Sequence, residues 1–181
     1  IDGGDGANET NTLIGQDIAN TWVIGDTSFL SATPADSSPA SSETAYVKSF
    51  TGINQLVGGT GADHFIIGVN GFVGSIDGGE GNDTLQSSDG KNAWSITSEE
   101  TSLTVSVDPS NSYVTTFTGI DKLIGGSNVD TFNITAAFTG DIEGGDGDDV
   151  FTVQAEVGKL FGNAGNDSFI MGSGGIATLI D

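Results

Sequence analysis

The chain has 181 residues, which is enough for one domain or for one segment of a longer array. It carries 25 Asp and Glu residues against four Lys and Arg, and the formal net charge of −21 argues against nucleic acid and anionic membrane surfaces as partners. The sequence has no cysteine and no apolar run long enough to span a membrane, so we expect neither disulfide bonds nor membrane insertion.

Acidic chains are often disordered, but the apolar content of this one predicts a folded protein. Hydrophobic residues make up 35% of the chain, Phe occurs ten times, and the apolar positions recur in register. The chain also has 29 Gly and no window with sustained helical periodicity. These features predict an all-β fold.

Six short segments share one frame, with glycine at the first, second and fourth places and an acidic or amide side chain at the sixth. In chain order they begin at Gly3, Gly58, Gly78, Gly125, Gly144 and Gly162. The sixth place holds Asn8 in the first segment and Asp63, Asp83, Asp130, Asp149 and Asp167 in the others. Asn128 and Asn163 replace one glycine each, and asparagine tolerates left-handed backbone better than most residues.

Apolar residues alternate with polar ones on both sides of these loops. Leu56 precedes the loop at Gly58 by two residues, and Phe65 and Ile67 follow it at alternate positions. Alternation with a period of two predicts short strands with one buried face. Where two loops follow each other closely, they begin 20, 19 or 18 residues apart, which leaves room for two strands and two turns. The sequence therefore predicts a parallel β-roll or β-solenoid of stacked 18–20-residue circuits.

A longer repeat overlies the loops. Residues 50–59 (FTGINQLVGG) match residues 117–126 (FTGIDKLIGG), and residues 20–24 (NTWVI) match residues 92–96 (NAWSI). The two copies diverge between the tryptophan and the phenylalanine, where the interval exceeds one ordinary circuit. We expect wider, irregular circuits there, without a metal-binding loop.

The divergent parts have different compositions. The segment Ser31–Ser42 is rich in Ser, Ala and Pro and is typical of an exposed loop, whereas Asp108–Asn111 is typical of a turn. Trp22 and Trp94 share one context, and we expect both to pack in the core or at its edge, with stacking on a sugar as the alternative.

The chain begins and ends at the same phase of the repeat, since Ile1-Asp2-Gly3 resembles Ile76-Asp77-Gly78 and the last residues are Ile180-Asp181. We expect residues 1–181 to form a single β-solenoid segment, an interior slice of a longer array. Its sub-repeats would be about 1–75, 76–141 and 142–181. Open strand edges at both ends would pair with neighbouring repeats of the same chain or with like subunits, end to end.

Glycine loops that contain a carboxylate offer the ligands of a hard cation. Glycine permits positive φ and lets carbonyl oxygens turn inward, and the sixth-place aspartate adds a carboxylate. Six to eight oxygen ligands suit Ca²⁺ better than Mg²⁺. With no Cys and one His, the chain lacks the ligands of a thiolate or multi-histidine site. One loop cannot supply six ligands, so we expect each ion to lie between stacked loops.

The expected ligands are sixth-place side chains and loop carbonyls. They belong to Asp63, Asp83, Asp130, Asp149, Asp167, Asn8, Gly59, Gly61, Gly79, Gly81, Gly126, Gly145, Gly147 and Gly165. We expect about three complete sites, one between each close pair of loops. Acids at the variable places, such as Glu80 and Asp146, are expected to form a solvated rim. The simpler alternative is that all these loops are only solvated turns, since Gly, Asn and Asp favour turns in any case.

The loop frame resembles the G-G-x-G-x-D-x-U-x nonapeptide of the RTX, or hemolysin-type calcium-binding, proteins, and residues 78–86 (GGEGNDTLQ) fit it in full. The tryptophan-containing repeat is similar, more loosely, to repeats of very large bacterial surface and secreted proteins. The resemblance implies a parallel β-roll that binds Ca²⁺, orders when it does so, and is secreted or held on the bacterial cell surface. Family members typically carry loops on both sides of the roll, whereas one loop per circuit here predicts metal on one side only.

We therefore expect a calcium-binding structural module of a secreted or cell-surface protein, such as an adhesin, and no enzyme. An active site is normally one place, but these carboxylates recur at every circuit, and His64 has no partner cluster. Three alternatives stay open. They are an end-to-end filament or surface-layer subunit, a module that binds a glycan or cell surface through the tryptophans, and the calcium-binding appendage of a secreted polysaccharide-active enzyme.

Overall fold

The protein is built from short β-strands, and no helix occurs in the residues that the structure describes. The structure, a computed structural model, describes residues 1–4, 9–25, 29–32, 44–47, 49–68, 71–87, 89–97, 103–107 and 112–181. The strands are β1 (Thr12–Ile14), β2 (Asn20–Ile24), β3 (Phe29–Ala32), β4 (Thr44–Val47), β5 (Gln55–Gly59), β6 (His64–Ile67), β7 (Phe72–Gly79), β8 (Thr84–Gln86), β9 (Asn92–Ile96), β10 (Leu103–Val107), β11 (Ser112–Thr118), β12 (Lys122–Ser127), β13 (Thr131–Ile134), β14 (Asp141–Asp146), β15 (Val150–Val153), β16 (Glu156–Ala164), β17 (Ser168–Met171) and β18 (Ile176–Ile180). The predicted all-β class is confirmed.

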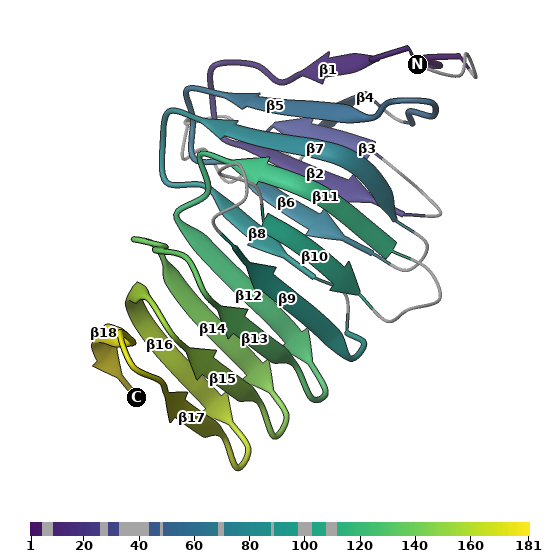
Figure 1. Cartoon of the computed structure of the whole chain (residues 1–181). Coiled ribbons are helices and arrows are strands. Elements are labelled where there is room, and N and C mark those ends of the chain that lie inside the picture. The colour runs from purple at the N-terminus through teal and green to yellow at the C-terminus, as the bar shows by residue number, and fades with distance from the viewer. Residues whose placement is uncertain are drawn as a thin grey trace.

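The strands form two sheets of nine strands each. Within each sheet, the strands follow one another along the long axis of the roll (Figure 1). The first sheet has the order β1-β5-β7-β11-β10-β9-β13-β15-β17. The second, read along the same direction, has the order β4-β3-β2-β6-β8-β12-β14-β16-β18. Ordinary circuits place one strand in each sheet, and successive circuits pair in parallel, as β13 does with β15 and β14 with β16. This arrangement confirms the predicted parallel β-roll of stacked circuits.

The strand registers place equivalent residues of successive circuits directly on one another. Trp94, Phe132, Phe151 and Phe169 follow each other across β9, β13, β15 and β17. Their rings are stacked, with successive centroids 5.5, 4.8 and 4.7 Å apart. The places two residues after Asp130, Asp149 and Asp167 therefore belong to one continuous aromatic column, as the alternation of the sequence predicts.

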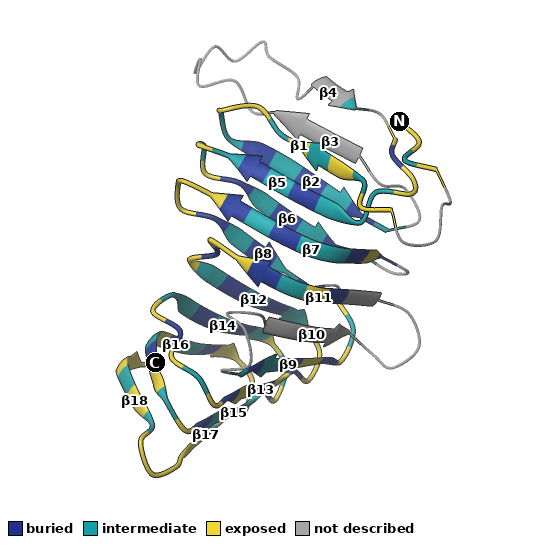
Figure 2. Ribbon diagram, turned by 45° about the horizontal axis from the view of Figure 1, so that its top comes forward, coloured by how far each residue is buried: buried dark blue, intermediate teal, exposed yellow. Residues whose placement is uncertain are grey.

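The core consists of buried apolar side chains contributed by both sheets. Figure 2 shows that buried residues alternate with less buried ones along the strands. Trp22 and Trp94 belong to the core, with exposed fractions of 0% and 2%, and Trp22 stacks on Phe65 with ring centroids 5.4 Å apart. Full burial of a large apolar side chain contributes about 1.5–3 kcal/mol relative to exposure. Both tryptophans therefore stabilise the roll, which confirms their expected packing role and leaves no indole on the surface for a sugar.

The two wider circuits are three-stranded antiparallel meanders. Strands β2, β3 and β4 form one in the second sheet, and β9, β10 and β11 form the other in the first sheet. Because three is odd, the chain leaves each meander in the direction in which it entered. The expected irregular circuits are confirmed. Residues 33–42 of the expected exposed loop and the expected turn at 108–111 lie outside the described residues.

The glycine loops lie on both edges of the roll, which corrects the expectation of a single metal-binding side. The loops at 58–63 and 78–83 lead from the first sheet into the second, whereas those at 125–130, 144–149 and 162–167 lead from the second into the first. Since the strands of each set are parallel, the two sets stack at opposite edges (Figure 1). The loops before β8 lie at one edge of the roll and those after it at the other, so β8 has a loop at each end.

Candidate metal centre: two rows of buried aspartates

The loops owe their shape to left-handed backbone at the second and fourth places. In the loop at Gly144 these places are Gly145 and Gly147, with φ of 111° and 141°. Asn128 and Asn163, which interrupt the glycine pattern, adopt φ of 74° and 69°. Asparagine is one of the few other residues that enter this region at low cost. Both loops therefore keep the shape predicted for them.

In the loops that carry aspartate at the sixth place, the first place requires glycine because of close packing. A Cβ at Gly58 would overlap the carboxylate of Asp63 in its own loop and the carbonyl oxygen of Gly78 in the next circuit. Gly125 stands in the same relation to Asp130. A side chain at this place would displace the aspartate, so the first-place glycine and the sixth-place aspartate form one structural unit.

At one edge, three sixth-place residues and Asp121, from the turn between β11 and β12, form a row of hydrogen bonds that we call the first row (Asn20, Asp63, Asp83 and Asp121). The N–H of Asn20 donates to Asp63 Oδ1 at 2.7 Å, and the N–H of Asp63 donates to Asp83 Oδ1 at 2.7 Å. The N–H of Asp83 then donates to Asp121 Oδ2 at 2.9 Å. Asp63 and Asp83 are buried. Each buried carboxylate thus ties its loop to the preceding circuit.

The opposite edge holds the second row (Asn92, Asp130, Asp149 and Asp167). The N–H of Asn92 donates to Asp130 Oδ1 at 2.7 Å, and the N–H of Asp130 donates to Asp149 Oδ1 at 2.7 Å. The N–H of Asp149 donates to Asp167 Oδ1 at 2.9 Å. Asp130 and Asp149 are fully buried. Both rows therefore consist of an asparagine, two buried aspartates and a more exposed final aspartate.

Only one oxygen of each buried carboxylate has a hydrogen-bond donor. The Oδ2 atoms of Asp63, Asp83, Asp130 and Asp149 are buried without a partner. Asp63 Oδ2 lies beside the carbonyl oxygen of Gly78, which is also an acceptor. An unsatisfied buried polar group costs about 1–3 kcal/mol, and more when it is charged. Such a pair of oxygens requires a proton on the carboxyl or a cation nearby.

Burial raises the pKa of these carboxyls, because desolvation disfavours the charged form. It raises the pKa of Asp63 from 3.8 to about 6 and that of Asp130 from 3.8 to about 7, although hydrogen bonds from the row asparagines act in the opposite direction. Burial also raises the pKa of Asp83 and Asp149. The rows are therefore poised to take up positive charge near neutral pH.

The structure brings together the pairs of aspartates that the sequence predicts. Asp63 adjoins Asp83, and Asp149 adjoins both Asp130 and Asp167. The predicted glycines, Gly59, Gly61, Gly79, Gly81, Gly126, Gly145, Gly147 and Gly165, lie in the same stacked loops. The loops also contact one another through the backbone, as when the N–H of Gly147 donates to the carbonyl oxygen of Ala164 at 2.6 Å.

The first segment is the exception among the predicted loops. Asn8 lies outside the described residues, so its role as a ligand stays a prediction. Asn11 has the hydrogen bond typical of a row, since its N–H donates to Asn54 Oδ1 at 2.8 Å, as the N–H of Asp83 does to the carboxylate of Asp121. The loop frame does not predict this hydrogen bond, because Asn11 lies three residues beyond the sixth place.

Sequence reasoning missed the residue that starts each row. Asn20 and Asn92 stand at the sixth place of loops that begin at Gly15 (GQDIAN) and Ser87 (SSDGKN). These two loops lack most of the glycines that define the loop frame, so the frame does not identify them. Their Asn-x-Trp spacing equals the Asp-x-Phe spacing of other loops, and this spacing could have predicted them. The tryptophan-containing circuits thus contain a loop of the same shape, with asparagine in place of aspartate. The expectation that these circuits lack a metal-binding loop stays a prediction.

Acids at the variable loop places form an exposed rim, as expected for Glu80 and Asp146. Within the described residues, ion pairs join Lys122 to Glu143 at 2.6 Å and Lys159 to Asp141 at 3.5 Å. Four basic residues cannot balance 25 acidic ones. The uncompensated negative charge favours the uptake of cations.

The loops fit a cation that accepts mostly backbone ligands. Among the described residues, no three His, Asp or Glu side chains converge into a ligand group. An ion would therefore take a carboxylate oxygen from the row and the remaining ligands from loop carbonyls, a donor set that suits Ca²⁺. The unpartnered Oδ2 atoms meet this requirement, because each is a buried acceptor that lacks a positive partner.

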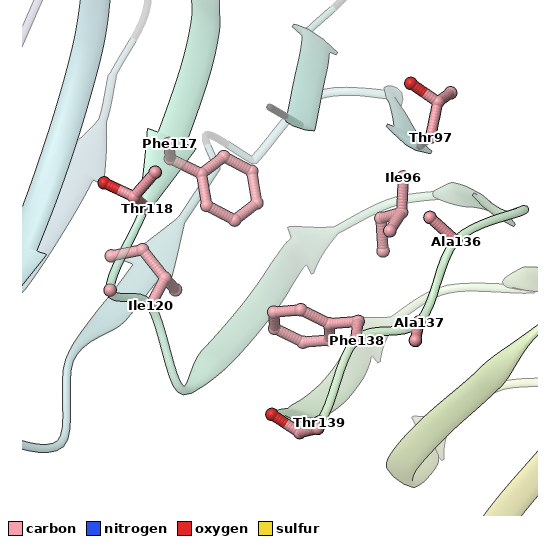
Figure 3. Close-up of a pocket in the computed structure, with 10 residues that line it drawn as sticks. Ile96, Thr97, Phe117, Thr118, Ile120, Ala136, Ala137, Phe138 and Thr139 are labelled. Carbon is pink, nitrogen blue, oxygen red and sulfur yellow. The ribbon is translucent and has the colours of Figure 1, made fainter. Parts of the chain in front are cut away.

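A separate cavity of about 510 Å³ lies where the first row ends (Figure 3). Phe117 lines it from β11, Ile120 from the turn between β11 and β12, and Phe138 from the turn before β14. Thr97, Thr118 and Thr139 add hydroxyl groups. Among the described residues, no ionisable side chain lines this cavity.

No protein-family model, curated protein or solved structure matches this chain. The likeness to the RTX proteins therefore rests on the loop frame alone. Within the described residues, no helix has the length and hydropathy needed to cross a membrane.

Acidification should stabilise the metal-free protein. The folded-state pKa values of Asp63 and Asp130 lie above the ordinary value of 3.8, so the folded state binds protons more tightly than the unfolded state. Their contribution to the free energy of unfolding is complete below about pH 4 and is lost as the pH rises through about 6 to 7. In chelator, the β-signal of the circular dichroism spectrum should therefore rise as the pH is lowered from about 8 to about 5.

The double variant Asp63→Asn, Asp130→Asn is the matched control, because neither amide titrates. Its β-signal should change less over the same range, and the remaining change reports general charge repulsion and the other carboxyls. A wild-type β-signal that falls on acidification, or an equal change in the double variant, contradicts this assignment.

Proposed function

We propose that the chain is a calcium-binding structural module of a secreted or cell-surface repeat protein, in which Ca²⁺ between stacked loops makes the roll rigid. The observation that carries the proposal is the set of buried Oδ2 atoms without partners at Asp63, Asp83, Asp130 and Asp149. Burying ionised carboxylates is costly unless positive charge accompanies them. In a chain of net charge −21, an external cation is the available source of that charge.

The residues of the two rows would hold the ions. Asp63 and Asp83 would serve the first row, and Asp130, Asp149 and Asp167 the second, with loop carbonyls as further ligands. Bound Ca²⁺ supplies positive charge that opposes the repulsion between stacked acidic loops. A role of this kind is structural, because the same arrangement recurs along the axis and, in the part of the chain that the structure describes, no single place gathers the groups of an active site.

An extracellular location agrees with this chemistry. The chain has no cysteine, so a metal is the remaining means of stapling a fold outside the cell. Modest calcium affinity is sufficient there, because extracellular modules bind Ca²⁺ with dissociation constants of about 10⁻⁴–10⁻³ M. Calcium uptake would then couple folding to export, since the ligands stack only in the folded roll.

Calcium should drive folding of the isolated chain. In chelator at neutral pH the far-ultraviolet circular dichroism spectrum should be coil-like, and titration to millimolar Ca²⁺ should produce a cooperative β-signal, because binding free energy becomes folding free energy. Mg²⁺ at the same concentration should be much less effective, since it releases its waters reluctantly. Identical spectra in chelator and in calcium would falsify the proposal.

The position of an aspartate in its row should set its effect on folding. Asp149 adjoins an aspartate on each side, whereas Asp63 adjoins Asp83 on one side and Asn20 on the other. Asp149→Ala should therefore raise the calcium concentration at half-maximal folding more than Asp63→Ala does. Circular dichroism in calibrated calcium buffers measures both values. Equal shifts would show that the ions are not shared between adjacent loops.

End-to-end assembly is a second candidate function, and the exposed apolar residues at one end of the roll favour it. Strands β17 and β18 are the outermost strands of their sheets and present an edge that no described strand pairs. Large apolar side chains on these strands are 42–61% exposed. They are Ile170, Met171, Ile176, Leu179 and Ile180. An apolar strand edge is a template for pairing with a like subunit or a neighbouring repeat.

Light scattering coupled to size-exclusion chromatography tests this assembly. The folded chain should form larger species as its concentration rises, and Ile176→Lys should suppress them by placing charge on the edge. Phe72→Lys is the matched control, because Phe72 is 58% exposed but lies in β7, away from that end. A chain that stays monomeric at high concentration, or equal effects of the two variants, argues against end-to-end assembly.

The glycan-binding alternative loses the side chains on which it relied, since Trp22 and Trp94 are buried. An appendage of a polysaccharide-active enzyme would use the same calcium rows, so it differs from the main proposal only in what the rest of a parent protein does.

A further inference from the structure

The side chain of Asn20 fills a position that is surrounded by oxygen atoms. Its amide nitrogen Nδ2 lies 2.9 Å from the carbonyl oxygen of Gln16, 2.7 Å from that of Ile18 and 3.2 Å from that of Gly58. It also lies 2.6 Å from Asp63 Oδ1. These acceptors come from two successive circuits. An amide group has two protons to donate, so four oxygens exceed what it can bond linearly.

Asn92 repeats this arrangement at the opposite edge. Its Nδ2 donates to the carbonyl oxygens of Gly90 at 2.9 Å and Gly125 at 2.8 Å, and to Asp130 Oδ1 at 2.7 Å. In both cases the acceptors are the fourth-place carbonyl of the same loop, the first-place carbonyl of the next circuit and the carboxylate of the next circuit. The oxygen-rich position is therefore a property of the loop frame.

The Oδ2 atom of a row aspartate lies in the same position as this nitrogen. A Cβ at Gly15 would meet Asn20 Nδ2 and the carbonyl oxygen of Gly58. A Cβ at Gly58 would meet Asp63 Oδ2 and the carbonyl oxygen of Gly78. An acceptor thus replaces a donor while the surrounding acceptors remain. This substitution accounts for the buried Oδ2 atoms that have no partner.

We propose that Asn20 and Asn92 are built-in donors that replace Ca²⁺ at the first level of each row. Those two levels then stack without metal, whereas the aspartate levels that follow need an ion. The inference rests on the proposed calcium-binding function and deepens it. Each asparagine also donates twice to the next carboxylate, through its backbone N–H and its amide, so it fixes that aspartate before any ion binds.

Two substitutions at Asp130 distinguish the gain of a hydrogen-bond donor from the loss of a metal ligand alone. Asp130→Asn supplies an amide at the oxygen-rich position, so it should fold at a lower free calcium concentration than wild type and bind about one ion fewer. Asp130→Ala supplies no donor, and it should require more calcium than wild type. Circular dichroism in calcium buffers measures the half-folding concentration, and isothermal titration calorimetry measures the number of ions.

The reciprocal variant removes a built-in donor. Asn92→Asp should raise the calcium concentration at half-maximal folding, because a metal-free level becomes metal-dependent. Asn133→Asp is its charge-matched control, since Asn133 is exposed in β13 and the substitution adds the same negative charge. The control should shift the half-folding concentration several-fold less.

The outcomes distinguish this inference from the proposed function. The donor role is wrong if Asp130→Asn needs as much calcium as Asp130→Ala, or if Asn92→Asp behaves like Asn133→Asp. If the wild-type chain does not respond to calcium, the calcium function fails and the donor role is decided in chelator alone. There, the urea midpoint of Asp130→Asn must exceed those of wild type and Asp130→Ala, and a lower or equal midpoint overturns the role.

Discussion

The hydrogen bond from a sixth-place N–H to the carboxylate of the next circuit is the interaction on which the rest of the roll depends. It holds Asp63 or Asp130 inside the loop, and that position in turn excludes any side chain from the first place. It also fixes the register of the following strand, so that the residue two places later falls on its equivalent in the neighbouring circuit. The aromatic column and the aspartate rows are therefore two results of one constraint, and neither would persist if the carboxylates turned outward.

The period of the sequence was sufficient to predict the fold. Repeated loops with alternating apolar flanks leave few arrangements other than stacked circuits, and Asn128 and Asn163 adopt the left-handed backbone that their places require. The direction of the carboxylates could not be predicted, because a turn of glycine and aspartate is compatible with an outward or an inward side chain. The loops ending at Asn20 and Asn92 were missed for a related reason, since their place is defined by hydrogen bonds that no glycine pattern reveals.

The oxygen-rich position inside each loop can be satisfied in three ways. An amide satisfies it at Asn20 and Asn92, and a proton would satisfy it at the aspartates, in keeping with the raised pKa of Asp63 and Asp130. A bound cation is the third way and the one proposed for neutral pH. The three differ in what controls them: the first is encoded in the sequence, the second responds to acidity and the third to ion concentration. One backbone frame can thus combine permanent and conditional levels.

The change of edge at β8 bears on the mechanics of a longer assembly. β8 is three residues long with a loop at each end, and β1, also three residues long, occupies the equivalent place in the preceding copy of the longer repeat. Each copy thus transfers its acidic column to the other flank. In a tandem rod of such copies, contraction or swelling of the columns would act on alternate flanks and cancel, so the rod would change its stiffness with ion occupancy and keep a straight axis. If the acidic column lay on one flank only, a change in its length would curve the rod toward or away from that flank.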